Sequence, residues 1–138
     1  MEMTMTVSTK NNTRLAQGTK AFEDSLGISA DAFIAGFAEI APGFGEMILE
    51  SEFGTAYQRP GLDLLTRELI IVATCAMLGT AGTGAVKLHI PAALRAGATR
   101  TQIVETLVQI SFSAGLPIAI GALQTARSLF AEMDSKAT

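Results

Sequence analysis

Few residues of this chain could carry acid–base or nucleophilic chemistry. His89, Cys75 and Tyr57 are the single residues of their types, and Glu68 is the acid that lies inside a strongly apolar segment. Histidine is the side-chain type whose ordinary pKa lies nearest neutrality, so His89 is the natural proton carrier. A catalytic site in this chain is therefore expected to be built around these residues.

Glu68 shares one face of an expected helix with Ile71, Val72 and Cys75, because the spacings are three, four and seven residues. That face is otherwise apolar and suited to a core, where a carboxylate is costly unless it is paired. Pairing with Arg67 or a later arginine would make Glu68 structural. Burial without a partner raises the pKa of a carboxylic acid toward neutrality, which suits a general acid or base. Both roles are open on these grounds.

His89 lies in a segment of small and apolar residues, where a histidine is either a hydrogen-bonded core residue or a catalyst. Pro91 follows two residues later. A proline inside a helix removes one hydrogen bond, here the one to the carbonyl of Lys87, so a kink beside the histidine is expected. Such a kink can open a small cavity, but it can equally accommodate a neighbouring helix.

Thiol, nucleotide and metal chemistry are all disfavoured. Cys75 stands late in its expected helix, far from the helix N-terminus that would activate a thiol, so we expect it to be buried and inert. The glycines at 79, 82 and 84 follow a helix and lack the pattern of a phosphate-binding loop. A single histidine without nearby acids does not form a metal site, and none is expected.

The elements that position these residues are all helical, since apolar residues recur with a period near 3.6 and no segment alternates like a strand. Asp63 is expected to cap a helix that extends to Met77, and Thr99 with Gln102 forms a capping box. Pro117 suits the first turn of a last helix. Other expected features are helices at 14–25, 29–40 and 42–53, and a buried face of Ile103, Val104, Leu107, Val108 and Ser111.

The length of 138 residues predicts a single domain, from 13 to 134, after a flexible tail of residues 1–12 that has no signal-peptide pattern. A net charge of −3 and scattered basic residues argue against nucleic acid as a partner. The uncharged stretches 69–86 and 106–126 contain polar residues or glycines, so we expect buried helices and no membrane partner.

One cysteine is consistent with a cytoplasmic location. The mean hydropathy of +0.37 indicates apolar surface between subunits.

The segment from Arg59 to Ile70, RPGLDLLTRELI, resembles the carboxymuconolactone decarboxylase family, which has an all-α, alkylhydroperoxidase D-like fold. The similarity continues through KLHI at 87–90, AALRAGATR at 92–100, IVE at 103–105 and AGLP at 114–117. It covers roughly residues 53–130. The resemblance implies a helical subunit that assembles into trimers or hexamers, with a pocket between helices near the subunit contacts.

The resemblance also implies an activity. The decarboxylase branch releases CO2 from a carboxylated muconolactone without a cofactor, and His89 stands at the place of its acid/base histidine. The peroxidase branch uses a CxxC pair ahead of this histidine, assisted by a glutamate of the preceding helix. Gly82 to Ala85 occupy that stretch here, so peroxidase activity is not expected.

We therefore expect a cofactor-free lyase acting on a small carboxylated lactone or keto acid, with His89 and Glu68 as the catalytic residues. Arg59 and Arg67 are candidates to bind substrate carboxylates, because a guanidinium matches a carboxylate in a bidentate manner. Tyr57 and Ser113 complete the expected substrate-binding set.

Two other functions stay open. Ala85 stands where many decarboxylase-like members have a glutamate four residues before the histidine, so an ion-pairing or proton-relay partner for His89 is missing. Ser113 stands where the family often has tyrosine. A related cofactor-free isomerase or cyclase-like enzyme is one alternative, and a non-catalytic oligomer that binds a small molecule is the other.

Overall fold

The computed structural model describes the backbone of residues 2–137 and the side chains of residues 13–137, and all its regular elements are helices. This confirms the expected all-α fold. The chain divides into two compact units, residues 1–62 and 63–138, where the sequence predicts one domain from 13 to 134. A segment with Pro60 and Gly61, which do not continue a helix, separates the last helix of the first unit from Asp63.

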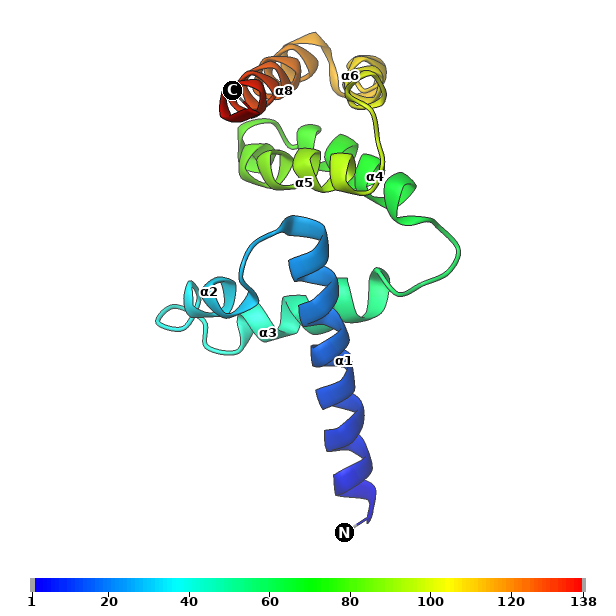
Figure 1. Ribbon diagram of the computed structural model, residues 1–138, viewed down its shortest axis with the longest axis vertical. Helices are drawn as coiled ribbons and strands as arrows, with labels where there is room; N and C mark the ends of the chain where they lie inside the picture. The colour runs from blue at the N-terminus through cyan, green and yellow to red at the C-terminus, as the bar shows by residue number, and fades with distance from the viewer. Residues whose placement is uncertain (1, 138) are drawn as a thin grey trace. The chain divides into compact units, whose positions relative to one another are not determined.

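The first unit contains α1 (Glu2–Leu26), α2 (Ala30–Ala35), α3 (Phe44–Ile48) and the π-helix η1 (Leu49–Ala56) (Figure 1). The sequence predicts a loose tail over residues 1–12, whereas α1 begins at Glu2. That segment contains no glycine or proline, so its residue types do not interrupt a helix.

The helix capped by Ser29 is shorter than expected. Ser29 accepts a hydrogen bond from the Ala32 N–H at 3.2 Å, which confirms the predicted cap. The helix ends at Ala35 instead of Ile40, and α3 begins at Phe44 instead of Pro42. Gly43 has φ +89°, a conformation that glycine adopts without strain, and it separates the two helices.

An aromatic cluster forms the core of the first unit. The buried ring of Phe22 lies 4.8 Å from the ring of Phe33 and 5.1 Å, edge to face, from the ring of Phe53. Such pairs each contribute about 0.5–1.5 kcal/mol beyond the area they bury. The cluster therefore connects α1, α2 and η1.

Two glycines let α1 and η1 approach closely. A Cβ atom at Gly18 would collide with the backbone carbonyl of Leu49, and one at Gly54 would collide with that of Arg14. Both obstacles are backbone, which cannot rotate away as a side chain can. The crossing of these helices therefore requires glycine on both sides.

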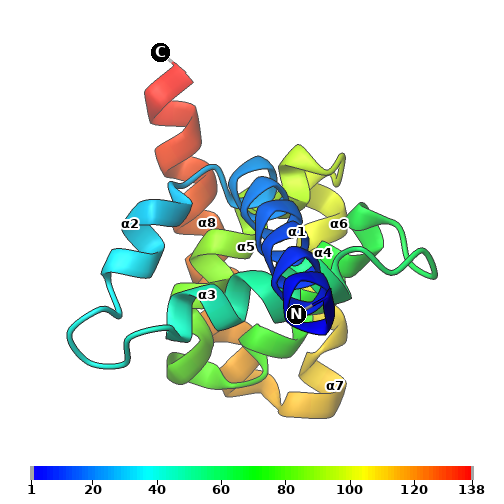
Figure 2. The same cartoon turned by 90° about the horizontal axis from the view of Figure 1, so that it is seen from below.

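The second unit is built from α4 (Leu64–Ala76), the 3-10 turn η2 (Gly79–Gly82), α5 (Thr83–Arg95), α6 (Arg100–Gln109), α7 (Ser111–Ala114) and α8 (Leu116–Ala137). In Figure 1, α4 and α5 form one layer, and α6 and α8 form a second. The short α7 lies at the bend that joins α6 to α8 (Figure 2).

Apolar residues of all four long helices fill the space between the two layers. The fully buried members with the largest side chains are Val72, Ile90, Ile103 and Leu107. The predicted inner face of α6 is confirmed for Ile103 and Leu107 but wrong for Val108, which is 40% exposed. A helix of ten residues packed on one side buries only a narrow stripe, and position 108 lies at its edge.

The predicted caps of this unit are confirmed. Asp63 accepts a hydrogen bond from the Thr66 N–H at 2.8 Å, and α4 extends to its C-cap at Met77. Thr99 and Gln102 form both hydrogen bonds of the capping box. Pro117 lies in the first turn of α8, as its fixed φ and missing N–H favour.

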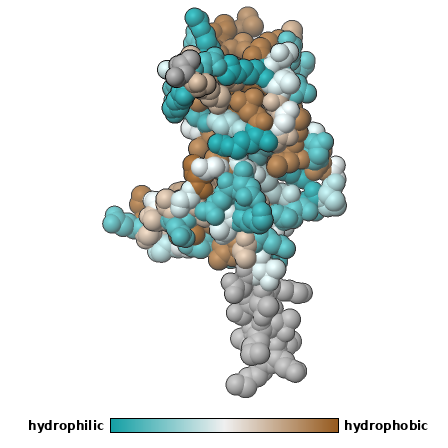
Figure 3. Space-filling view, viewed as in Figure 1, coloured by the Kyte–Doolittle hydropathy of each residue, from teal (hydrophilic) through white to brown (hydrophobic). Residues whose placement is uncertain are grey.

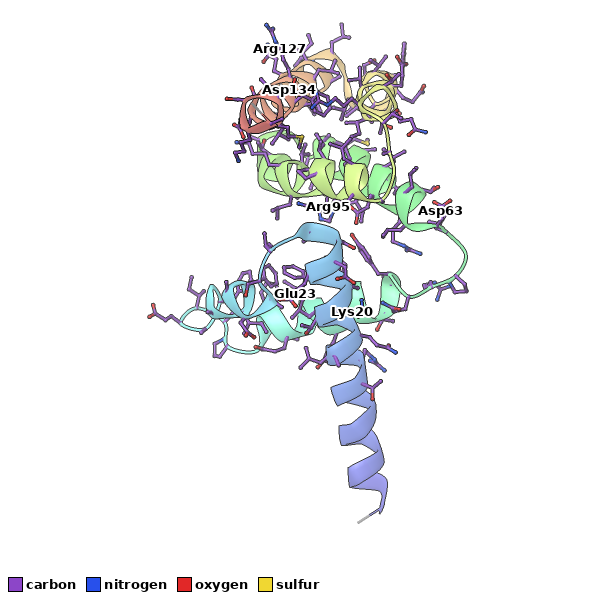
Figure 4. All side chains as sticks on the ribbon, in the orientation of Figure 1. Lys20, Glu23, Asp63, Arg95, Arg127 and Asp134 are labelled. Carbon is purple, nitrogen blue, oxygen red and sulfur yellow. The ribbon has the colours of Figure 1, made fainter. Side chains whose placement is uncertain are left out.

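An exposed ionic contact joins the start of α6 to the end of α8. The Arg100 guanidinium donates to both carboxylate oxygens of Asp134, at 2.7 and 3.1 Å, and lies 4.8 Å from the Phe130 ring centre. Figure 4 labels Asp134 near the end of α8. The hydrogen bonds from Arg100 lower the pKa of Asp134 below its ordinary value. The pair is bidentate, which is the geometry in which a surface ion pair stabilises most.

Within the part of the chain that the structure describes, none of the helices combines the length and the apolar character needed to cross a bilayer.

We predict that Gly18→Ala will destabilise the protein by about 1–3 kcal/mol, because the added methyl group must displace the backbone of η1. Alanine is intrinsically a better helix former than glycine, so a lower free energy of unfolding in Gly18→Ala must come from the packing effect. Urea unfolding measures the free energy of unfolding of each variant.

The matched control is Gly84→Ala on α5, where an added Cβ meets no atom within 4 Å. This change should stabilise the protein by up to about 1 kcal/mol. Equal effects of the two variants would contradict the close approach at Gly18.

Candidate functional site

The structure brings His89 and Glu68 together inside the second unit. The Nδ1 atom of His89 lies 2.7 Å from the Oε2 atom of Glu68, a short hydrogen bond. The Glu68 side chain is 0% exposed and that of His89 is 9% exposed. The imidazole is therefore the member of the pair that can reach a substrate.

The two residues meet because α4 and α5 lie side by side (Figure 1) and each places one polar residue in the layer between them. On α4, Val72 follows Glu68 one turn later and is fully buried. On α5, Ile90 and Ala93 pack into the core beside His89. The carboxylate and the imidazole thus meet across the two helices, within a largely apolar core.

This pairing corrects one conclusion drawn from the sequence. Because Ala85 leaves His89 without an acidic residue four positions earlier, the sequence predicts that His89 has no partner. Glu68, on the preceding helix, is that partner. Helical spacing relates residues of the same helix only, whereas this contact joins residues 21 positions apart on two helices. The sequence does contain one indication of the contact: α4 carries a single acid among apolar residues, and the next long helix carries the single histidine.

The geometry fixes which imidazole nitrogen is available for chemistry. When Glu68 is ionised, its carboxylate only accepts hydrogen bonds, and the contact at 2.7 Å then places a proton on Nδ1. The other nitrogen, Nε2, then carries a lone pair in neutral histidine and a proton in the imidazolium form. A histidine held in this way can give or take a proton at Nε2 while its orientation stays fixed.

Pro91 is accommodated within α5, which extends without interruption from Thr83 to Arg95. Because proline has no N–H, the Lys87 carbonyl lacks its usual helical donor. The kink expected from the sequence stays a prediction.

The other expected site residues lie on different elements. Tyr57 and Arg59 follow η1 in the first unit, and the Tyr57 ring lies 4.5 Å from the Phe53 ring. Arg67 precedes Glu68 on α4 and is half-buried, while Ser113 lies on α7 and is exposed. Their roles in substrate binding stay predictions.

Cys75 is half-buried on α4 and packs against the core of the second unit. Its carbonyl is in the way of any side chain at position 82, because a Cβ atom on Gly82 would collide with the Cys75 oxygen. Among the described residues, no group of three or more histidine, cysteine or acidic side chains could hold a metal ion.

Comparisons with known proteins identify relatives of this chain. The model of the carboxymuconolactone decarboxylase family matches residues 42–128, a range that includes both Glu68 and His89. An uncharacterized 15.0 kDa protein of Paracoccus denitrificans is 35% identical over 98 residues, which are 71% of this chain and 73% of that protein. A 4-carboxymuconolactone decarboxylase of Acinetobacter baylyi is 29% identical over 90 residues, 65% of this chain and 66% of the relative.

Asp63 positions the helix that carries Glu68, and its role as a cap gives a pH-dependent prediction. Hydrogen bonds from the Thr66 hydroxyl and N–H lower the pKa of Asp63 below its ordinary value. This stabilisation is thus present above about pH 4 and is lost as the pH falls through the lowered pKa. We predict that Asp63→Ala lowers the melting temperature at pH 7 and that the difference from wild type shrinks toward pH 3.

Asp63→Asn is the control, because asparagine caps a helix without a titrating group. It should stay close to wild type at pH 7. A deficit of Asp63→Ala that is the same at pH 7 and pH 3 would contradict the contribution of the ionised cap.

Proposed function

The chain belongs to the carboxymuconolactone decarboxylase family, and we propose that it is a cofactor-free lyase that removes CO2 from a small carboxylated lactone or keto acid. The observation that carries the proposal is the buried hydrogen bond between His89 and Glu68, with only the imidazole partly exposed. The named activity of the Acinetobacter baylyi relative supports the choice of reaction.

The proposed reaction uses the substrate's own conjugated carbonyl as the electron sink. As the carbon–carbon bond to the carboxylate breaks, CO2 leaves and the bonding electron pair moves into the carbonyl system to form an enolate. The Nε2–H of the His89 imidazolium then protonates the enolate carbon, and water returns a proton to His89. The sum of these steps is one carboxylate plus one proton giving CO2 and a C–H bond. The substrate must therefore be a β-keto acid or its vinylogue.

In this proposal, Glu68 holds the imidazole through Nδ1 and stabilises its positive charge before protonation of the enolate. Arg59 and Arg67 are the candidates for binding the substrate's carboxylates, and Tyr57 and Ser113 are candidates for hydrogen bonds to the lactone or keto oxygens. Hydrogen-bond donors placed at the developing enolate oxygen would lower the barrier, because charge accumulates there as CO2 leaves.

We predict that His89→Ala lowers kcat by about 10² to 10⁴, because the proton donor is lost. Glu68→Gln should lower kcat by more than about tenfold with little change in KM, because the amide carries no charge to stabilise the imidazolium. The assay follows CO2 release from 4-carboxymuconolactone and, as a second probe, from oxaloacetate. Product analysis distinguishes a lyase from an isomerase, which converts the lactone without releasing CO2.

Cys75→Ser is the matched control on the same helix as Glu68 and should retain turnover within about tenfold of wild type. Melting curves separate the catalytic role of Glu68 from a structural one, since a purely structural role lowers stability and leaves kcat of the folded protein unchanged. Unaltered turnover of His89→Ala would refute the proposed proton transfer.

We further propose that the protein is a homo-oligomer, a trimer or a hexamer. The second unit exposes several large apolar side chains, which are costly to leave in water. Brown, apolar surface is visible over this unit in Figure 3. The most exposed are Phe112 at 84%, Leu78 and Leu116 at 65%, and Ile120 at 52%.

We predict that sedimentation equilibrium at micromolar concentration will give three or six times the chain mass of 14.4 kDa. Phe112→Glu should shift the population toward smaller species, because burying a charge at the contact is unfavourable. The control Lys136→Glu lies in the last turn of α8 and should leave the mass unchanged. A wild-type species of 14.4 kDa alone would refute the oligomer.

A further inference from the structure

A trough separate from the His89–Glu68 pair lies on the second unit between α5 and α8. It consists of two adjoining cavities of about 380 and 400 Å³. Thr83 on α5 and Gly121 and Thr125 on α8 line both cavities, so the two cavities adjoin. Volumes of this size are typical of sites for small molecules.

The trough is apolar at one end and polar at the other. The first cavity, beside the start of α8, is lined mainly by apolar residues such as Val86 and Ile118. The second is lined mainly by polar and charged ones: Lys87, Gln124, Ser128 and Glu132. From Ile118 to Ser128, α8 rises about 15 Å at 1.5 Å per residue. An elongated molecule with an apolar body and a polar head matches this pattern.

Hydrogen-bond donors at the polar end favour a negatively charged head. Lys87 is one helical turn after Thr83, and neither side chain forms a hydrogen bond or an ion pair with residues 13–137. The N–H of Thr83, the first residue of α5, already donates to the Thr80 carbonyl of the preceding turn η2, so the Thr83 hydroxyl and the Lys87 ammonium are the donors offered to a ligand. The Thr125 hydroxyl donates to the Gly121 carbonyl, at 3.1 Å. Glu132 is the one acid that lines this cavity.

The trough and the proposed catalytic pair use different faces of α5. At about 100° per residue, His89 is about 120° around the helix from Thr83 and about 160° from Lys87. Neither His89 nor Glu68 lines either cavity. A ligand in the trough therefore does not depend on the reaction proposed above.

We propose that this trough is a second binding site, which takes a small amphipathic carboxylate. Its apolar body lies between α5 and α8 at the Ile118 end, and its carboxylate is held by Thr83 and Lys87. Glu132 opposes the negative head and so limits the affinity.

The experiment titrates octanoate into the protein and follows the backbone amide signals of Thr83, Gly121 and Thr125 by NMR. Octanoate should bind saturably, and Lys87→Gln should weaken binding by about tenfold or more because the charge-assisted contact is lost. Gly121→Leu should abolish binding. A Cβ at this position meets no protein atom within 4 Å, so the new side chain fills the trough without disturbing the fold. Glu132→Gln should tighten binding.

Two controls locate the site. Gly84→Leu adds the same side chain on α5 at an open position that lines neither cavity, and it should bind octanoate like wild type. His89→Ala should also bind normally, which separates this site from the catalytic pair. Octyltrimethylammonium, with a similar chain and a positive head, should bind at least tenfold more weakly. Binding that survives Gly121→Leu, or equal binding of the two head groups, would overturn the proposal.

Discussion

The hydrogen bond between the buried Glu68 carboxylate and the His89 imidazole is the contact on which the second unit depends. A carboxylate that is 0% exposed is tolerated only with a polar partner, and a partner on another helix fixes how the two helices lie along each other. Sliding α5 by one turn would bring an apolar residue to the carboxylate. The same contact that satisfies the acid thus aligns α4 with α5 and orients the imidazole.

Local features of this chain could be predicted from the sequence, and contacts between distant segments could not. The caps at Asp63 and Thr99 and the start of α8 at Pro117 involve residues within one helical turn, so residue types suffice to place them. The shorter α2 and the π-helix of residues 49–56 depend on packing against α1. For η1, this packing requires the close approach between Gly18 of α1 and Gly54 of η1. Residue type and an apolar setting indicate His89 and Glu68 as residues that could carry chemistry, but their contact depends on how two helices align.

Helix α5 serves three purposes with three of its faces. Ile90 and Ala93 pack into the core, His89 faces Glu68, and Thr83 with Lys87 lines the trough, while Val86 borders both the core and the apolar end of the trough. Because successive helical residues are rotated by about 100°, the His89 face lies apart from the trough face. Changes on one face therefore leave the backbone that supports the other two intact, provided that the core face is kept.

The close packing of Gly82 against the Cys75 carbonyl has an evolutionary consequence. Position 82 begins the stretch to which the family resemblance assigns the CxxC pair of the peroxidase branch. A single mutation to cysteine there would push α4 away from the 3-10 turn before a second cysteine could give any benefit. A cysteine at position 82 would therefore lower the stability of the fold on its own. The backbone contact at Gly82 thus disfavours the first cysteine of such a pair.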